Sequence, residues 1–213
     1  MKITPINPTN LGWLEVELES SMLSYLWECI KESGEKEPCK DTLVGQIDSS
    51  FTIADKDRIF WDSVLSPLCD EYGEEYGHDH AEVNVQSSKG EGRWDTFEFY
   101  LRDFWVNYQK KYEYNPNHNH GGVYSFVVWM KIPTRFEDQA KLYNSQNANA
   151  KYNSTFNFQY LDILGRSRTH TYALNPEDEG KLLLFPSRLL HVVYPFFECD
   201  EERISMSGNI WLK

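Results

Sequence analysis

The chain has 213 residues and a formal net charge of −12, with 21 basic against 33 acidic side chains. This length suits one domain with a substantial core, and 40% hydrophobic with 15% aromatic residues is the composition of a folded protein. The acidic balance argues against a nucleic-acid backbone or an anionic membrane as the main partner. We therefore expect a small-molecule or peptide substrate, no nucleic acid and no membrane, while the oligomeric state stays open.

The cysteines and the N-terminus predict a cytoplasmic protein. The four cysteines are scattered and form no CxxC pair, as is typical of reduced thiols rather than of a disulfide framework. The first residues start no apolar signal-peptide region, and no run approaches the roughly 18 apolar residues of a membrane span.

The first elements are a strand and a helix. Apolar and acidic residues alternate over residues 14–18, which predicts a half-buried edge strand. Either Ser20 or Ser21 can cap the helix that follows, and its apolar residues recur at three- and four-residue spacing until just before Gly34.

A second helix is predicted from about Asp55, with a bend at Pro67, and the two helices are expected to brace a sheet. The acidic stretch 71–82 follows. It contains His80-x-Glu82, which has the residue types of a metal site, but it enters no apolar strand. We interpret it as a solvated acidic loop.

From Trp94 onward the pattern predicts strands, at 97–101, 104–109, 123–132, 155–161, 169–174, 181–185, 191–195 and 203–212. The polar segment 134–152 between them is predicted to be a lid or recognition loop, with a disordered surface insertion as the alternative. Helices followed by about eight strands predict an α+β fold with a double-sheeted roll. We expect one domain over 1–213, with 1–93 as helical and strand support and 94–213 as the core with the metal site.

Three histidines form a candidate metal site. His118 and His120 lie one residue apart at the start of an apolar strand, where alternate residues project to the same face, and imidazole is a common metal ligand. A third, His191, lies 73 residues after His118 at the end of another apolar strand. Arg203 and Ser205 follow on one strand face, where a guanidinium fork and a hydroxyl can bind a carboxylate.

Other interpretations of these residues stay open. His118 and His120 fit one ligand plus one hydrogen-bonding histidine, or two surface histidines in an Asn/Gly-rich turn. His170 is a weaker candidate for a metal ligand and also fits an ordinary strand residue. For Tyr124 and Trp129 we favour a packing role in the core.

The order of these residues resembles the Fe(II)- and 2-oxoglutarate-dependent oxygenases, over roughly Trp105 to Trp211. Within that superfamily the sequence is most similar to the small prolyl-hydroxylase-like proteins of tailed phages. The similar segments are Asn107-Tyr108-Gln109-Lys110-Lys111, Asn115-Pro116, Phe185-Pro186-Ser187 and the stretch 202–209. The resemblance implies a double-stranded β-helix, or jelly-roll, core braced by the N-terminal helices. If the protein is phage-encoded, it would work in the host cytoplasm.

The resemblance also implies an activity. A dioxygenase of the hydroxylase type would use Fe(II), 2-oxoglutarate and O2, with ascorbate in support, to hydroxylate a C–H bond and release succinate and CO2. By the same resemblance, the metal ligands would be His118, His120 and His191. Co-substrate would be bound by Arg203, Ser205 and Tyr108, the last placed ten residues before His118.

One departure from the family pattern is visible, because the family has His-x-Asp or His-x-Glu where this chain has His118-x-His120. Loss of a carboxylate predicts a changed metal preference or redox potential. Three alternatives follow. A cupin-like metal protein would have a glutamate four or five residues after the histidine pair, where this chain has Tyr124 and Ser125. The other two are a halogenase-like site, in which His120-x-Gly122 is the motif, and a non-catalytic phage structural or binding module.

Overall fold

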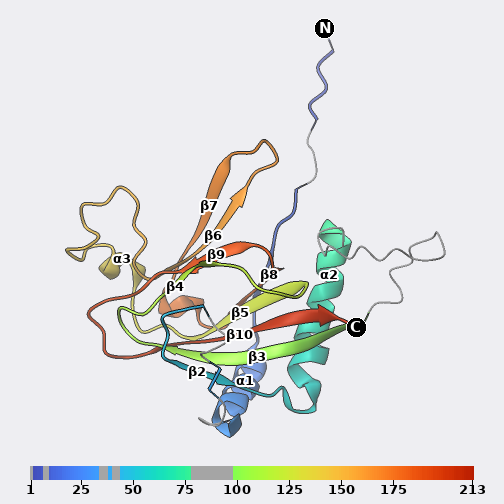
Figure 1. Cartoon of the computed structure of the whole chain (residues 1–213), viewed down its shortest axis with the longest axis horizontal. Coiled ribbons are helices and arrows are strands. Elements are labelled where there is room, and N and C mark those ends of the chain that lie inside the picture. Colours follow the sequence, from blue (N-terminus) through green and yellow to red (C-terminus); the bar gives the residue numbers. More distant parts are fainter. Residues whose placement is uncertain (1, 7–9, 34–37, 40–43, 78–97) are drawn as a thin grey trace, which may run out of the picture.

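The protein folds into two antiparallel β-sheets, with helices on one face of the larger (Figure 1). This computed structural model describes residues 2–6, 10–33, 38–39, 44–77 and 98–213. The predicted α+β fold with a double-sheeted roll is confirmed within these ranges. Residues 71–76 of the acidic stretch 71–82 are helical, as part of the helix Ser66–Tyr76, so the predicted loop is wrong for this part. The motif His80-x-Glu82, Phe97 and the predicted boundary at residues 93 and 94 lie outside the described residues.

The large sheet has the strand order β1-β8-β5-β10-β3-β2 and the small sheet has the order β4-β9-β6-β7. In the large sheet the strands are β1 (Leu14–Glu17), β8 (Lys181–Pro186), β5 (Tyr124–Lys131), β10 (Arg203–Leu212), β3 (Phe99–Gln109) and β2 (Ser49–Thr52). In the small sheet they are β4 (Asn115–His118), β9 (Leu190–Val193), β6 (Thr155–Leu161) and β7 (Ser167–Ala173).

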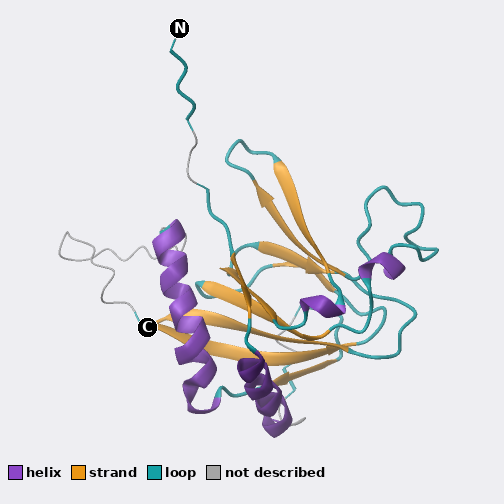
Figure 2. Ribbon diagram, turned by 180° about the vertical axis from the view of Figure 1, so that it is seen from behind, coloured by secondary structure: helices purple, strands orange, loops and turns teal. Residues whose placement is uncertain are grey.

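Two helices, α1 (Ser20–Ser33) and α2 (Ser66–Tyr76), cover the large sheet on the side away from the small one (Figure 2). The predicted second helix is divided: a 3-10 turn (Lys56–Arg58) and a π-helical turn (Trp61–Leu65) precede α2. Pro67 lies in the first turn of α2, and the π-helical turn runs into α2 directly before it. The irregularity therefore lies just before the proline.

The sheet separates two cores, and β5 contributes to both. Phe126 and Val128 pack with α1 and α2 in an outer core, whereas Val127 and Trp129 face the small sheet in an inner core. Because both faces are covered, the strand is a continuous apolar run rather than an alternating one. Tyr124 packs against α2 in the outer core, so it and Trp129 have packing roles, as we favoured.

Three strands differ from the prediction, and one of them, β2, lies in a segment for which no strand was predicted. β3 is one strand where two were expected, because the polar residues Arg102 and Asp103 interrupt its apolar pattern. A bulge in the pairing with β10 accommodates Arg102, since Leu101 pairs with Ile210 and Asp103 with Asn209. β4 was not among the predicted strands. It forms at the edge of the small sheet, a place that tolerates Pro116.

The segment 134–152 consists of α3 (Phe136–Gln139) followed by turns. The side chain of Gln139 attaches this segment to the main chain of Phe197. The amide NH2 of Gln139 donates to the carbonyl of Phe197, and its amide oxygen accepts from the N–H of Phe197, both at 2.8 Å. It is therefore an ordered surface loop, and its role as a lid stays a prediction.

All four cysteines are free thiols, as predicted. In the described part of the chain, no helix is both long and apolar enough to cross a membrane. A 3-10 turn (Pro176–Asp178) completes the short elements.

Candidate metal centre

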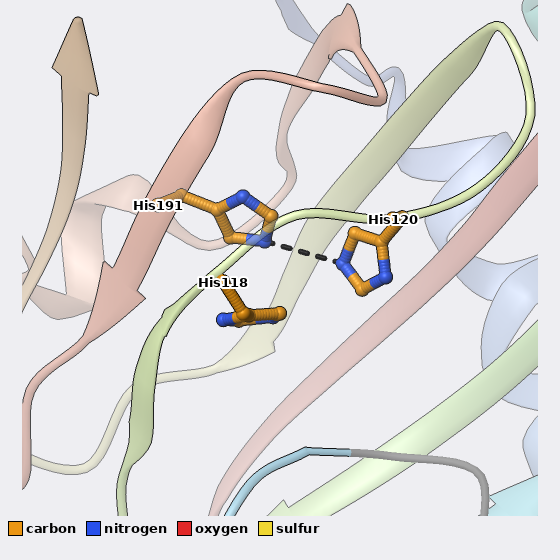
Figure 3. A group of neighbouring side chains, drawn as sticks. All are labelled: His118, His120 and His191. Atoms are coloured by element: carbon orange, nitrogen blue, oxygen red, sulfur yellow. Dashed lines mark hydrogen bonds between the residues drawn. The ribbon is translucent and has the colours of Figure 1, made fainter.

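The rings of His118, His120 and His191 lie next to one another (Figure 3). The register of β4 with β9 puts His118 directly opposite His191, and His120 follows two residues later. One ring nitrogen from each lies within 4.8 Å of the others, and the Nε2 atoms of His120 and His191 are 3.2 Å apart. Two nitrogens bound to one ion at about 2.1 Å lie about 3.0–3.4 Å apart for angles near 90–110°, so this pair already has the separation of two ligands of one metal ion.

Backbone carbonyls set the orientation of two of the rings. Nδ1 of His118 donates to the carbonyl of Pro116 at 2.6 Å, and Nδ1 of His191 donates to that of Leu189 at 2.9 Å. Because a carbonyl oxygen only accepts, the proton of each neutral ring must be on Nδ1. Each Nε2 therefore keeps its lone pair for a metal, an arrangement common among histidine ligands.

A tight turn places His120. Its N–H donates to the carbonyl of Ser187 at 2.8 Å, and the turn then docks on β10. Gly122 has φ +90°, and a Cβ there would lie 2.7 Å from the carbonyl oxygen of Ile210. Only glycine fits this position, which explains the second of the two glycines that follow His120.

Burial keeps all three rings neutral. It lowers the pKa of His118, lowers the pKa of His120 to about 4 with help from His118, and holds the pKa of His191 well below its usual value. The rings can thus bind a cation near neutral pH without first losing protons. Among the described residues, no carboxylate joins the cluster. The carboxylate that the family pattern has at position 120 is therefore not replaced by an acid from another segment of that part of the chain.

The metal-free protein is expected to lose stability as pH falls from about 6.5 toward 4. In this pH range the histidines of the unfolded chain are protonated, whereas the buried rings of the folded protein stay neutral because their pKa values are lowered. Unfolding therefore binds protons, and the stability of the folded protein rises with pH. Thermal melts of the chelator-treated protein between pH 4 and 7.5 test this. His120→Gln should flatten the dependence, whereas His170→Gln, which changes an exposed histidine of β7, should not. Equal slopes for both variants would contradict the assignment.

Arg203 is a buried cation on the inner face of β10. Its Nε and Nη2 donate to Oε1 of Gln109 at 2.9 and 2.7 Å, Nη2 also donates to the carbonyl of Tyr194, and Nη1 lies 3.4 Å from Oγ of Ser154. No acidic side chain among the described residues pairs with it. Burial lowers the pKa of the guanidinium, which still stays protonated at neutral pH. A buried charge without an opposite charge is costly, and a ligand carboxylate would supply one.

The other two predicted co-substrate residues have different positions. Ser205 lies on the same face of β10 as Arg203, opposite Asn107 of β3. Tyr108 lies on the other face of β3, in the outer core, with its ring centroid 6.0 Å from that of Phe51. The structure thus does not bring Tyr108 to the histidines, because strand alternation turns it toward the helices.

Two residues beside Tyr108 face the roll interior and were missed from sequence. Gln109 holds Arg203. Asn107 is buried, accepts a hydrogen bond from Oγ of Ser50 at 2.8 Å, and lines the space next to the histidines. The sequence does not show which residues of β3 face the roll interior and which face the helices. The pairing of Gln109 with Arg203 settles this, because it places the odd-numbered residues 107 and 109 on the interior face.

Two spaces adjoin the cluster. The inner one measures about 60 Å³, room for an ion and a few water-sized groups, and lies between the histidines and Asn107 and Ser207. The outer one is a cleft of about 820 Å³. Trp105 and His120 line both, so a molecule in the cleft can reach the metal position.

Two antiparallel sheets enclose three converging imidazoles and a buried arginine that has no acidic partner among the described residues, an arrangement that could hold a metal ion. The sequence pattern of the family described as "Putative 2OG-Fe(II) oxygenase" matches residues 103–209, just over half of the chain, and the chain belongs to this family. The matched range contains all three histidines, Arg203 and Ser205. Membership implies Fe(II), 2-oxoglutarate and O2 as cofactor and co-substrates, as the resemblance predicted.

Solved structures agree on the fold. The viral collagen prolyl hydroxylase of Paramecium Bursaria Chlorella virus-1, in complex with 2-oxoglutarate, is 11% identical with a TM-score of 0.52, covering 93% of this chain and 94% of that one. A prolyl-4-hydroxylase of Pseudomonas putida is 16% identical with a TM-score of 0.53, covering 93% and 91%. The fold is thus the predicted double-stranded β-helix braced by helices. No curated protein matches the chain.

Proposed function

We propose that this oxygenase is a hydroxylase that inserts oxygen into a C–H bond of a peptide or small molecule, with release of succinate and CO2. His118, His120 and His191 hold the metal, and Arg203 with Ser205 binds the distal carboxylate of 2-oxoglutarate. The observation that carries the proposal is the meeting of three imidazoles, within 4.8 Å, in a roll whose interior also holds an arginine that pairs with no acid in the described part of the chain. The whole chain, 1–213, is proposed to act as one domain.

When bound, Fe(II) with 2-oxoglutarate and O2 supplies the oxidising power for C–H hydroxylation. The protein positions the reactants and excludes water. The Nδ1–H bonds fix the rings of His118 and His191. Around His191, the rings of Phe156, Phe158 and Phe185 lie with centroids 5.6, 6.4 and 5.1 Å away, which keeps the inner face of the site dry. Because the inner space is small, 2-oxoglutarate binding requires neighbouring side chains to shift.

Anaerobic reconstitution tests this function. The protein is loaded with Fe(II), given 2-oxoglutarate and ascorbate, exposed to O2, and succinate is measured by mass spectrometry without added substrate. We expect slow, uncoupled succinate formation that a chelator stops. If the loaded protein neither binds 2-oxoglutarate nor forms succinate, it is not a hydroxylase.

A metal-binding roll with altered or absent catalysis is the second candidate, and one observation favours it: an imidazole at position 120 in place of the carboxylate of the family pattern. Two histidines and one carboxylate are the usual ligand set of non-haem Fe(II) oxygenases. Three neutral imidazoles leave the bound ion with its full charge.

His120→Asp is expected to raise uncoupled succinate formation by about tenfold or more, because it restores the oxygen ligand of that set. His120→Ala is the matched control and should lower both metal content and turnover. If the aspartate variant behaves like the alanine variant, position 120 does not supply a metal ligand. If only the aspartate variant turns over, the natural chain is the catalytically altered form.

A further inference from the structure

Asn107 is a buried amide on the middle one of three neighbouring strands. β3 pairs with β10 on one side and with β2 on the other, and Asn107 lies opposite Ser205 and opposite Ser50. The residue is 6% exposed, and its side chain, on the interior face of β3, lines the inner space next to the histidines. Pairing on both sides fixes the backbone here, so the amide is held in a defined place.

Ser50 fixes how the amide of Asn107 is turned. Its hydroxyl donates to Oδ1 of Asn107 at 2.8 Å, inside the protein. The Nδ2 group has two N–H donors, and no described residue accepts a hydrogen bond from it. Nδ2 is nevertheless not enclosed, because in the described part of the chain the fully enclosed side-chain atoms without a partner both belong to Asn157. The donors of Asn107 therefore border open space, and the space that Asn107 lines is the inner one.

The inner space suits a ligand of two or three atoms. Its volume of about 60 Å³ has room for an ion and a few water-sized groups. The three imidazoles line one part of it, and the amide of Asn107 and the hydroxyl of Ser207 line another. Phe156 and Phe185 are among the apolar residues of the remaining wall. A hydrogen bond in such dry surroundings is stronger than the same bond in water.

The chemistry of the amide N–H decides what it can bind. An N–H group is a donor only, so it repels a cation and cannot itself be a metal ligand. It can bond to an acceptor atom that is held on the ion. Because three neutral imidazoles leave a divalent ion with its full charge, an anion or another electron-rich small molecule is the ligand that both the ion and the amide attract.

We propose that Asn107, turned by Ser50, donates a hydrogen bond to a small ligand of two or three atoms on the metal ion held by the three histidines. A small anion can take this place, and in the hydroxylase it is the place of O2. The inference rests on the metal ligands of the proposed function, and it adds the group that holds the second reactant. Asn107 is then a binding residue for the small ligand, and Ser50 is a positioning residue that acts through it.

Azide binding to the Co²⁺-loaded, full-length protein tests the proposal. Azide is a three-atom anion that the protein cannot turn over, and the visible absorption of Co²⁺ reports its binding. We expect Asn107→Leu to weaken azide binding by about tenfold or more, because a hydrogen bond to a charged group is lost. The matched control is Asn157→Leu, which replaces an equally buried asparagine of β6 that does not line the inner space. It should bind azide like the natural chain.

Saturating 2-oxoglutarate separates this role from a contact with the co-substrate. We expect Asn107→Leu to weaken azide binding with 2-oxoglutarate present as well as without it, and to shift the infrared stretch of bound azide, which Asn157→Leu should leave in place. Equal azide affinity in Asn107→Leu and the natural chain would overturn the proposal. So would a loss confined to the affinity for 2-oxoglutarate or for Co²⁺, because Asn107 would then hold the co-substrate or support the ion itself.

Ser50→Ala tests the positioning role and guards against misfolding. Asn107→Leu alone leaves the buried Ser50 hydroxyl without its partner, which is destabilising, whereas the double variant removes both partners. Ser50→Ala should weaken azide binding in the natural chain but have no further effect beside Asn107→Leu. Equal losses in both backgrounds would refute the positioning role. Azide binding that depends on Asn107, without any succinate formation, would support this inference and count against the hydroxylase alone.

Discussion

Gln109→Glu is expected to abolish 2-oxoglutarate binding while leaving the metal site intact. Gln109 gives Arg203 a neutral oxygen at 2.7 and 2.9 Å, so the guanidinium keeps its charge for a ligand. A carboxylate in that place forms a charge-assisted pair with the guanidinium. The ligand carboxylate then meets a neutralised arginine and a second negative charge, and we expect at least ~100-fold weaker binding, in line with the several kcal/mol at stake in buried charge pairs.

Calorimetry of 2-oxoglutarate binding to the Zn²⁺-loaded variant measures this effect, and zinc titration of the metal-free variant checks the histidines. Gln159→Glu is the matched control, because Gln159 lies on β6 and accepts from Asn117 at an exposed position. It should bind 2-oxoglutarate like the natural chain. If Gln109→Glu binds within about threefold of the natural chain, Arg203 does not anchor the co-substrate.

His191→Ala is expected to remove metal binding and all turnover. His191 is the most buried of the three rings, and its Nε2 is 3.2 Å from that of His120. Loss of a residue that merely orients a ligand costs about 10–100-fold in metal affinity, so loss of a ligand should exceed that range. Metal content after purification and Co²⁺ absorption spectra report the loss directly.

The control is His170→Ala, which removes an exposed imidazole of β7 and should keep full metal content. His191→Ala also leaves a cavity among the phenylalanines, which is destabilising. His118→Ala, at a less buried position, is therefore measured in parallel. Retention of one tightly bound ion by both variants would show that the metal lies elsewhere.

The sequence predicted those parts of the fold in which the local pattern and the tertiary environment agree. The run at 123–132 is buried on both faces, so its apolar character was visible without any partner. β3 was divided in two because Arg102 sits in a bulge and Asp103 hydrogen-bonds to β10, which are contacts between distant segments. β4 was missed because its four residues show no apolar pattern, and Pro116 is tolerated in it because the strand lies at the edge of the small sheet.

The candidate site was predictable to the extent that it depends on spacing. The histidines and Arg203 follow the order that the family resemblance implies. Tyr108 was chosen by its distance from His118, but distance along a chain does not give the face of a strand, and the register with β10 turns it to the outer core. The partners of Arg203, which are Gln109, Ser154 and Tyr194, come from three separate segments. No local pattern connects them.

The guanidinium of Arg203, which has no acidic partner within the described ranges, has a consequence for the lifetime of the protein. Desolvation of this charge weakens the resting fold, and the ligand that supplies the opposite charge stabilises the folded form by mass action, by about 2.7 kcal/mol at a hundredfold excess over its dissociation constant. The population of transiently opened chains, on which proteases act, then falls as the concentration of the dicarboxylate rises. The abundance of the protein in a cell would follow the supply of its own co-substrate.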